Sequence, residues 1–368
     1  MRAKGLLRGR RKAALAGATA LLLAAAGLGT WAADSWPFDG KDRYCWGAWE
    51  EDSGPDFLGE AAFYDGNGSR TSEETAPTRQ RPAGRCTVAI RSSYESGSSG
   101  KNVTDTEVTV TYGPAPKDAA RRMEWLDDYL GDRAMPLPDG LPGATDGSHA
   151  LLVLPKRCDT RDGRPTAVTL DSDAQTSWSD GSMPGNAGLG GSRSVAELLV
   201  SAANRGMRAA DCAPATPLRV TSPVLTLPEK DEFVFSRACR IKGMDFERET
   251  AADLEYQVGA VTRDLQSCSV RTDRGAGRFF DALMIAQPRL AALLDGATGS
   301  KPPAGGWRGT GVFADTYQVV RADCADRPVT LLMLAPSVHQ MRPYFTAFTN
   351  AVTRRLGCAP VAPGGTDR

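Results

Sequence analysis

Apolar residues recur along four stretches of the chain at a spacing of three to four positions. This spacing places side chains on one face of a helix and therefore predicts helices. The four stretches cover residues 119–130, 194–202, 279–294 and 345–356. Ser194 and Glu197 are spaced as a capping box at the start of the second helix, and Pro288 is expected to kink or split the third.

Other apolar runs are short and rich in β-branched residues, as β-strands are. They cover residues 108–112, 149–154, 166–170, 312–320 and 329–334. The elements follow in the order strand, strand, helix, strand, strand, helix, and this order occurs twice. Short connections between neighbouring strands favour antiparallel pairing. We therefore expect an α+β fold in which each half is a mainly antiparallel sheet with helices on one face.

A recurring asparagine and cysteine pattern indicates that the two halves are a tandem duplication. Asn204 is followed after seven residues by Cys212-Ala213-Pro214. Asn350 is followed after seven residues by Cys358-Ala359-Pro360. Each half also has a cysteine shortly before an Arg-Pro pair and a strand-like run. We therefore predict a repeated β-β-α-β-β-α module.

Eight cysteines, four in each half, are expected to form disulfides that stay within the halves. The chain has no C-x-x-C pair and only two histidines, so the usual zinc spacings are absent and no metal site is predicted. Pairing first with second and third with fourth gives the bridges Cys45–Cys86, Cys158–Cys212, Cys239–Cys268 and Cys324–Cys358. The other two pairings within each half stay open at this point.

The N-terminus predicts export. Residues 1–12 are basic, and residues 13–33 form an uncharged run of 21 residues, which is long enough for a membrane span of about 20 residues. We expect a signal-anchor at the cell membrane, with the N-terminus inside and the body extracytoplasmic. The alternative is secretion after signal cleavage, because the run is rich in Ala and Gly and offers cleavage sites after Ala26 and Ala32.

Charge argues against nucleic acid as a partner. The whole chain carries 44 basic and 44 acidic side chains, but six of the basic ones lie in the first 33 residues, where no acid occurs. The remaining body therefore carries 38 basic against 44 acidic groups. Binding to phosphates needs a basic surface, which this acidic body does not provide.

The sequence contains no recognisable catalytic motif. His149 and His339 occupy different places in the two halves, and no serine has the G-x-S-x-G surroundings of a hydrolase nucleophile. Trp178, in a polar segment, and Trp307, in a glycine-rich loop, are the candidate binding residues, because exposed tryptophans anchor partners or sugar rings. The alternative is core packing, which is the more common role of a tryptophan beside a disulfide, and Trp178 is the one that we most expect to be exposed. No cofactor is predicted.

Arginine outnumbers lysine by 35 to 9, and the basic leader is followed by an Ala-rich span that ends in Trp36-Pro37-Phe38. In these features the chain resembles uncharacterised single-pass, membrane-anchored extracytoplasmic proteins of Streptomyces-type actinobacteria. The resemblance covers the leader, extends to the body only in general style, and implies a place in the cell envelope. It supplies no site residue.

The predicted domain organisation follows from composition. After residues 1–12 and 13–33 we expect a spacer (34–43), module 1 (44–216), a linker or edge strand (217–235), module 2 (236–360) and a tail (361–368). The polar segments 92–102 and 171–194 are expected to be surface loops. We expect a binding or accessory protein whose ligand is an envelope protein, a cell-wall polymer or a small molecule held between the halves. The alternative is a hydrolytic enzyme whose site is hidden in the sequence.

Overall fold

The computed structural model describes residues 43–51, 58, 68–96, 100–131, 134–175, 189–225, 239, 241–242, 244, 254–258, 261–272, 278–324, 327–335 and 338–364. Residues 42–368 cluster as one compact unit. The predicted membrane segment 13–33 lies outside the described residues. No helix within the described ranges is long and apolar enough to span a membrane.

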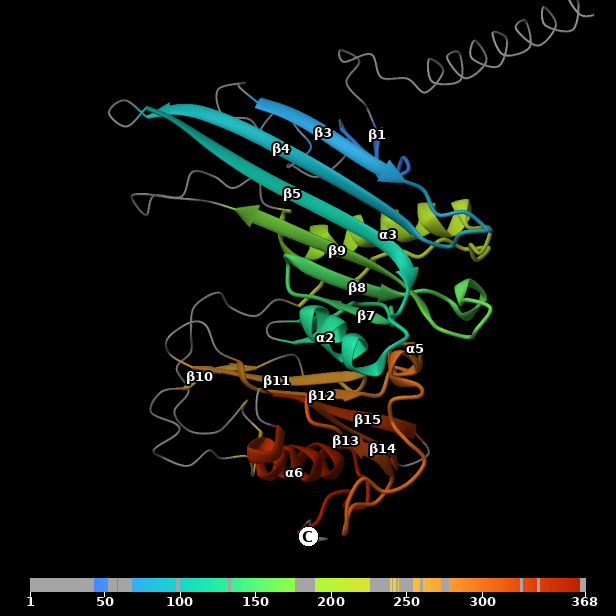
Figure 1. Ribbon diagram of the computed structural model, residues 1–368, viewed down its shortest axis with the longest axis vertical. Helices are drawn as coiled ribbons and strands as arrows, with labels where there is room; N and C mark the ends of the chain where they lie inside the picture. The colour runs from blue at the N-terminus through green and yellow to red at the C-terminus, as the bar shows by residue number, and fades with distance from the viewer. Residues whose placement is uncertain are drawn as a thin grey trace, which may run out of the picture. The chain divides into compact units, whose positions relative to one another are not determined.

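The first half contains a seven-stranded antiparallel sheet in the order β3-β4-β5-β9-β8-β7-β6 (Figure 1). Its strands are β3 (Gly68–Thr75), β4 (Gly84–Ser96), β5 (Gly100–Pro114), β6 (Met135–Pro136), β7 (Gly143–Thr145), β8 (His149–Val153) and β9 (Thr166–Gln175). Two short strands, β1 (Arg43–Tyr44) and β2 (Trp49–Glu50), form a separate hairpin.

The second half contains a six-stranded antiparallel sheet in the order β10-β11-β12-β15-β14-β13. Its strands are β10 (Leu254–Val258), β11 (Leu265–Thr272), β12 (Arg278–Ile285), β13 (Thr310–Phe313), β14 (Tyr317–Cys324) and β15 (Arg327–Leu334). Apart from β6, the strands of the two sheets follow the same order. In both sheets the third strand pairs with the last strand of its half.

The two helices of the first half cover opposite faces of its sheet. Strand β8 alternates: Leu151 and Val153 pack with helix α2 (Ala119–Leu130), whereas Leu152 and its neighbours pack with helix α3 (Gly191–Ala209). This is the period-two pattern of a strand that is buried on both faces. Our expectation that both helices lie on one face was therefore wrong.

The second half repeats this arrangement. Helix α6 (Val338–Arg355) packs on one face of the sheet with Leu331 and Met333 of β15. On the other face, Leu332 and Leu334 pack with α5 (Pro288–Ala291) and the 3₁₀ turn η6 (Ala292–Leu294). A further 3₁₀ turn, η4 (Lys156–Cys158), belongs to the first half.

The halves share one hydrophobic core, formed by α2 and its face of the first sheet together with α5, η6 and the facing side of the second sheet. Two arginines cross this boundary in opposite directions. Buried Arg122 of α2 donates to the carbonyls of Leu293 (3.0 Å) and Asp295 (2.8 Å). Arg289 of α5 donates to the carbonyl of Leu154 (3.0 Å) and to Asp159 (3.0 Å). The space between the halves is therefore largely filled by side chains.

The predicted helix over 279–294 was wrong. Residues 278–285 form strand β12, and only the residues from Pro288 onward are helical. The strand is buried on both faces, with Met284 in the core under α6 and Leu283 and Ile285 in the shared core. A continuous apolar run of this kind fits helical and strand spacing equally well. Within the described residues, three strands of the main sheet therefore precede the first helix of each half, not two.

Two smaller expectations also fail. Helix α3 begins at Gly191 after Gly190, so Ser194 and Glu197 lie inside the helix and do not cap it. The described parts of the polar segments 92–102 and 171–194 are mostly regular structure, because residues 92–96 extend β4, 100–102 extend β5 and 171–175 extend β9. Of the predicted linker, residues 217–225 are described and form no strand.

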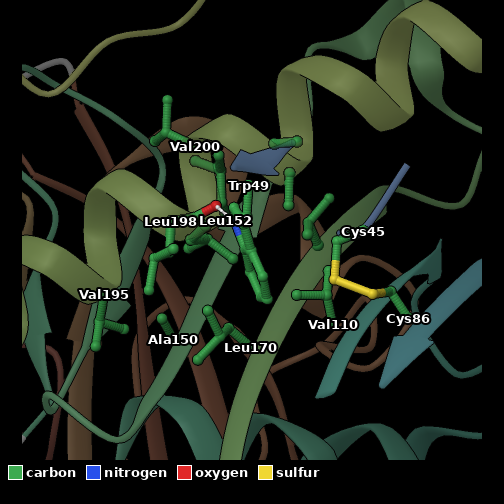
Figure 2. Close-up of a cluster of buried hydrophobic side chains, with 14 of the residues drawn as sticks. Cys45, Trp49, Cys86, Val110, Ala150, Leu152, Leu170, Val195, Leu198 and Val200 are labelled. Atoms are coloured by element: carbon green, nitrogen blue, oxygen red, sulfur yellow. Dashed lines mark hydrogen bonds between the residues drawn. A yellow bond between two sulfur atoms is a disulfide. The ribbon is translucent and has the colours of Figure 1, made fainter. Parts of the chain in front are cut away.

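The four predicted disulfides are confirmed: Cys45–Cys86, Cys158–Cys212, Cys239–Cys268 and Cys324–Cys358. Figure 2 shows the first bridge beside buried Trp49, whose indole nitrogen donates to the carbonyl of Leu198 at 3.1 Å. Four disulfides indicate an oxidising environment.

The recurring asparagines hold the chain that follows each last cysteine. The amide of Asn204 donates to the Leu218 carbonyl (2.9 Å) and accepts from its N–H (3.0 Å). Asn350 donates to the carbonyl of Pro363 (3.1 Å) and accepts from the N–H of Ala362 (3.2 Å). The repeated Asn thus has the same structural role in both halves.

Candidate functional site

A row of polar side chains crosses five adjacent strands on the α2 face of the first sheet. His149 of β8 lies opposite Asp171 of β9, and Asp171 lies opposite Thr109 of β5. Thr109 in turn faces Thr87 of β4, and Thr87 faces Glu73 of β3. Direct partners in an antiparallel sheet project from the same face. The five side chains therefore form a continuous polar strip, which we call the first-half row.

Helix α2 forms a wall beside this row. Trp125 and Tyr129, one turn apart, line a cavity of about 360 Å³ together with floor residues of β4, β5 and β9. Their rings are edge-to-face, with centroids 5.8 Å apart. The floor residues of the cavity are Arg85, Glu107, Thr109, Thr111, Thr169 and Asp171. We call this cavity the α2 groove.

Hydrogen bonds order the floor of the groove. The hydroxyls of Thr87 and Thr109 are 3.0 Å apart, and the Thr109 hydroxyl also lies 3.2 Å from a carboxylate oxygen of Glu107. On the wall, the Tyr129 hydroxyl donates to Asp171 at 2.8 Å. Glu107, Thr111 and Arg85 are solvent-exposed. The floor therefore offers prearranged donors and acceptors to a ligand without a large rearrangement.

A histidine–aspartate pair lies at one end of the row. The Nδ1 atom of His149 is 3.1 Å from Asp146, whose other oxygen accepts the N–H groups of Ser148 (2.7 Å) and His149 (2.6 Å). The pair is formed within the β7–β8 turn, so the turn geometry fixes the orientation of the imidazole. An imidazole oriented by a carboxylate is the arrangement of a general acid–base pair.

Ionisation around this pair is shifted by burial and hydrogen bonding. The hydrogen bond to Asp146 raises the pKa of His149, and the nearby charges of Asp171 and Asp128 act in the same direction. Burial alone would raise the pKa of Asp146, but the hydrogen bonds from His149 and Ser148 lower it overall. Burial also raises the pKa of Tyr129, so its hydroxyl stays protonated and donates to Asp171. Titratable groups with shifted pKa values thus gather next to the groove.

The structure brings His149 into this cluster but separates the other candidate residues from it. Trp307 is 6% exposed and packs in the core of the second half, stacked on Phe345 (5.7 Å) and edge-on to Phe313 (5.1 Å). The burial of Trp307 agrees with the core-packing alternative and not with a role as an exposed binding residue. Trp178 lies outside the described residues. His339 is exposed near Asp315 (3.7 Å), away from the first-half row.

The boundary between the halves, where we expected a ligand, is mostly core. A cavity of about 180 Å³ does lie at its edge, lined by Leu141 of the first half, Leu225 of the connecting segment, and Leu265 and Leu290 of the second half. Its volume is below the range of about 300–1,000 Å³ that ligand pockets occupy. The α2 groove falls within that range and contains more polar groups, so it is the stronger candidate.

The groove residues could not be recognised from sequence. Glu107, Thr109 and Thr111 alternate with apolar residues, which is the usual pattern of a strand with one solvent-facing side. Only the tertiary structure shows that Trp125 and Tyr129 stand beside that face. The one available signal was the occurrence of an aromatic pair at i and i+4 on a predicted helix.

In the comparisons with known proteins, no family model, no curated protein and no solved structure matches this chain.

Proposed function

We propose that the chain is an exported binding protein of the bacterial cell envelope and that the α2 groove is its binding site. In this proposal residues 13–33 anchor the protein in the cell membrane and the body is extracytoplasmic. The observation that carries the proposal is the groove itself: a hydrogen-bonded polar floor beside an aromatic wall, on a sheet held by disulfides. Concave sites with a few convergent polar groups are typical of ligand binding.

Several matched features support a tandem duplication of one module. The strand order agrees, and each half has two bridges that join its first cysteine to its second and its third to its fourth. Cys45 and Cys239 have nearly the same positive φ, 52° and 53°. Asp211 (57°) and Gly357 (76°), each directly before the last cysteine of its half, are also left-handed. Such agreement at unusual backbone conformations is expected of two copies of one ancestral fold.

Binding to envelopes tests the function directly. We expect the oxidised full chain, kept in mild detergent, to co-sediment with detergent-washed cell walls of a Streptomyces-type actinobacterium, from which the membrane that would hold the anchor has been removed. The double variant Glu107→Gln/Trp125→Ala should lose this binding, because it removes one exposed acceptor and the aromatic wall. Glu197→Gln is the matched control: this carboxylate is exposed on α3, behind the sheet, where it pairs with Arg193. Equal sedimentation of the wild type and the groove variant would contradict the proposal.

The anchor is tested separately by intact mass. If residues 1–33 are retained in protein isolated from membranes, they act as a signal-anchor. A mature chain that begins at Gly27 or Ala33 would instead mean a secreted protein. Either result leaves the groove proposal open to the sedimentation test.

A hydrolytic enzyme is the second candidate, and the His149–Asp146 pair beside the groove favours it. Its weakness is the nucleophile: within the described residues no hydroxyl or thiol is hydrogen-bonded to the imidazole. The catalytic proposal would therefore require His149 to activate a water molecule. If the chain hydrolyses an ester or glycoside and His149→Gln abolishes that activity while envelope binding persists, the enzyme proposal is correct.

A further inference from the structure

The α2 groove combines hydroxyl groups with carboxylates and one guanidinium. Thr109, Thr111, Thr169 and Tyr129 supply four hydroxyls among its lining residues. A hydroxyl both donates and accepts, whereas a carboxylate only accepts and a guanidinium only donates. A ligand that carries many hydroxyls of its own is the chemical class that can pair with all three kinds of group.

The lining of the groove contains charges of both signs. Its ionic residues are Arg85, Glu107 and Asp171, so the two carboxylates are offset in part by one cation. The guanidinium of Arg85 lies close to two threonine hydroxyls of the floor. Its Nε atom is 3.4 Å from the hydroxyl of Thr87, and its Nη2 atom is 3.5 Å from that of Thr109. A strongly anionic ligand would meet two carboxylates, and a polycation would meet Arg85. A neutral ligand avoids both repulsions.

Trp125 gives the wall of the groove a flat apolar surface. Trp125 is half-buried and lines the cavity, and its edge-to-face contact with Tyr129 limits its rotation. An indole ring with restricted rotation offers a flat surface on which the C–H face of a pyranose ring packs. The hydroxyls at the edge of the sugar ring can then reach the polar groups of the floor. The groove volume of about 360 Å³ lies at the lower end of the ligand-pocket range, as expected for one or two sugar rings.

We infer that the α2 groove binds a neutral saccharide, with a sugar ring packed on Trp125 and its hydroxyls paired with the floor of β4, β5 and β9. This inference rests on the proposed binding function and adds the ligand class to it. Glu107 and Asp171 act as acceptors for sugar hydroxyls, and Arg85 acts as a donor.

Calorimetric titration of the oxidised full chain tests the ligand class. The probes are the neutral trisaccharides chitotriose, maltotriose and mannotriose, with the cation spermine and inorganic polyphosphate as charged comparisons. At least one trisaccharide should bind. Trp125→Ala should weaken that binding by about tenfold or more, as expected for an aromatic anchor. Trp125→Phe should restore part of it, and Glu107→Gln, at an exposed position, should weaken it several-fold without affecting the fold.

The outcomes separate the ligand class from the binding function. If no trisaccharide binds at millimolar concentration, or if spermine or polyphosphate is the probe whose binding the groove variants abolish, the saccharide inference is wrong. In the second case the groove is still a binding site. If a trisaccharide binds equally well to the wild type, Trp125→Ala and Glu107→Gln, the groove is not its site, and the proposed function fails as well. Glu197→Gln should leave every affinity unchanged.

Discussion

In the first half, the row of cross-strand partners runs His149, Asp171, Thr109, Thr87 and Glu73, and the groove opens beside it. At the same register in the second half the row reads Tyr317, Leu334, Asp281, Ser269 and Gln257. The side chain of His149 is 38% exposed. Tyr317 and Leu334, by contrast, are 7% and 4% exposed and belong to the shared core.

The two halves share their fold but differ at the position of the candidate site. Strand order, bridges and Asn contacts agree between the halves, so none of these features makes a binding site. The difference lies in which side chains occupy the row and in what covers them. His149 and Asp171 keep their end of the first-half row polar, whereas Tyr317 and Leu334 turn the same positions into core. We therefore propose that ligand binding belongs to the first half alone.

Loss of a disulfide should lower the free energy of unfolding more than any other change considered below. The loss should be similar in both halves if the two halves have the same fold. The bridges Cys158–Cys212 and Cys324–Cys358 close separations of 54 and 34 residues. In the chain-entropy model each contributes about 4 kcal/mol, with only about 0.4 kcal/mol between them. Chemical denaturation of the two double Cys→Ala variants measures this. If the loss of stability is below about 1 kcal/mol for one cysteine pair alone, the two halves are not structurally equivalent.

The next largest effect should come from the contact between Tyr112 and Gly206, because the residues at this contact differ between the two halves. A Cβ at Gly206 would lie 2.5 Å from Cδ2 of Tyr112. The equivalent positions in the second half hold Met284 and Val352, both in its core, so a smaller strand residue accompanies a larger helix residue.

Gly206→Val should therefore cost about 2–3 kcal/mol, which is the upper part of the usual range for overpacking. Adding Tyr112→Met should recover part of this loss, because it copies the second-half combination. A double-mutant cycle by denaturation gives the coupling free energy. Strictly additive losses would contradict the proposed equivalence of the two positions.

Asn204→Ala and Asn350→Ala should each cost about 1–2 kcal/mol, because each removes two hydrogen bonds to the following chain. The two variants serve as controls for each other. Thermal or chemical unfolding measures the effect. If one loss exceeds the other several-fold, the repeated Asn does not have the same role in both halves.

The smallest expected effect is the pH dependence that comes from the His149–Asp146 pair of the first half. The pKa of His149 is raised above its ordinary value of 6.5, so its contribution to stability is full below pH 6.5 and is lost as the pH rises through the raised pKa. Asp146 has a lowered pKa, so its contribution is present above pH 3.8 and is lost as the pH falls through the lowered pKa. The pair should therefore stabilise most between about pH 4 and 6.5.

The size of this effect is at most about 1 kcal/mol, because the side chain of His149 is more than one-third exposed. His149→Gln should remove the decline in stability between pH 6 and 8, as measured by unfolding at several pH values. Tyr317, at the same register in the second half, has a pKa raised above 10.0 by burial and does not titrate in this range. An unchanged decline in the variant would show that other groups cause it.

The disulfide pairing and three of the helices could be predicted from the sequence. The ordered cysteines predicted all four bridges, and 3.6-residue spacing correctly identified α2, α3 and α6, because these helices each have a distinct apolar face. The same rule failed for β12, which is buried on both faces and has no polar side to reveal its period. The positions of the helices on opposite faces also escaped prediction, because strands such as β8 and β15 are apolar on both sides.

The candidate site depends on contacts between residues far apart in the chain, and these could not be predicted. Tyr129 meets Asp171 across 42 residues, and Thr87 meets Thr109 across 22. No local pattern specifies such pairs. For Trp307 the sequence left two roles open, an exposed binding residue in a glycine-rich loop or core packing, and the structure shows its ring in the core between Phe313 and Phe345.

Hydrogen–deuterium exchange of the oxidised full chain, with and without isolated cell envelopes, tests most directly whether only the first half binds. We expect added protection in β4, β5, β9 and α2 around the groove and none in the equivalent strands β11, β12 and β15. This protection should be lost in Glu107→Gln/Trp125→Ala. Protection centred on the second half, or protection of the groove strands that persists in this variant, would contradict the proposal.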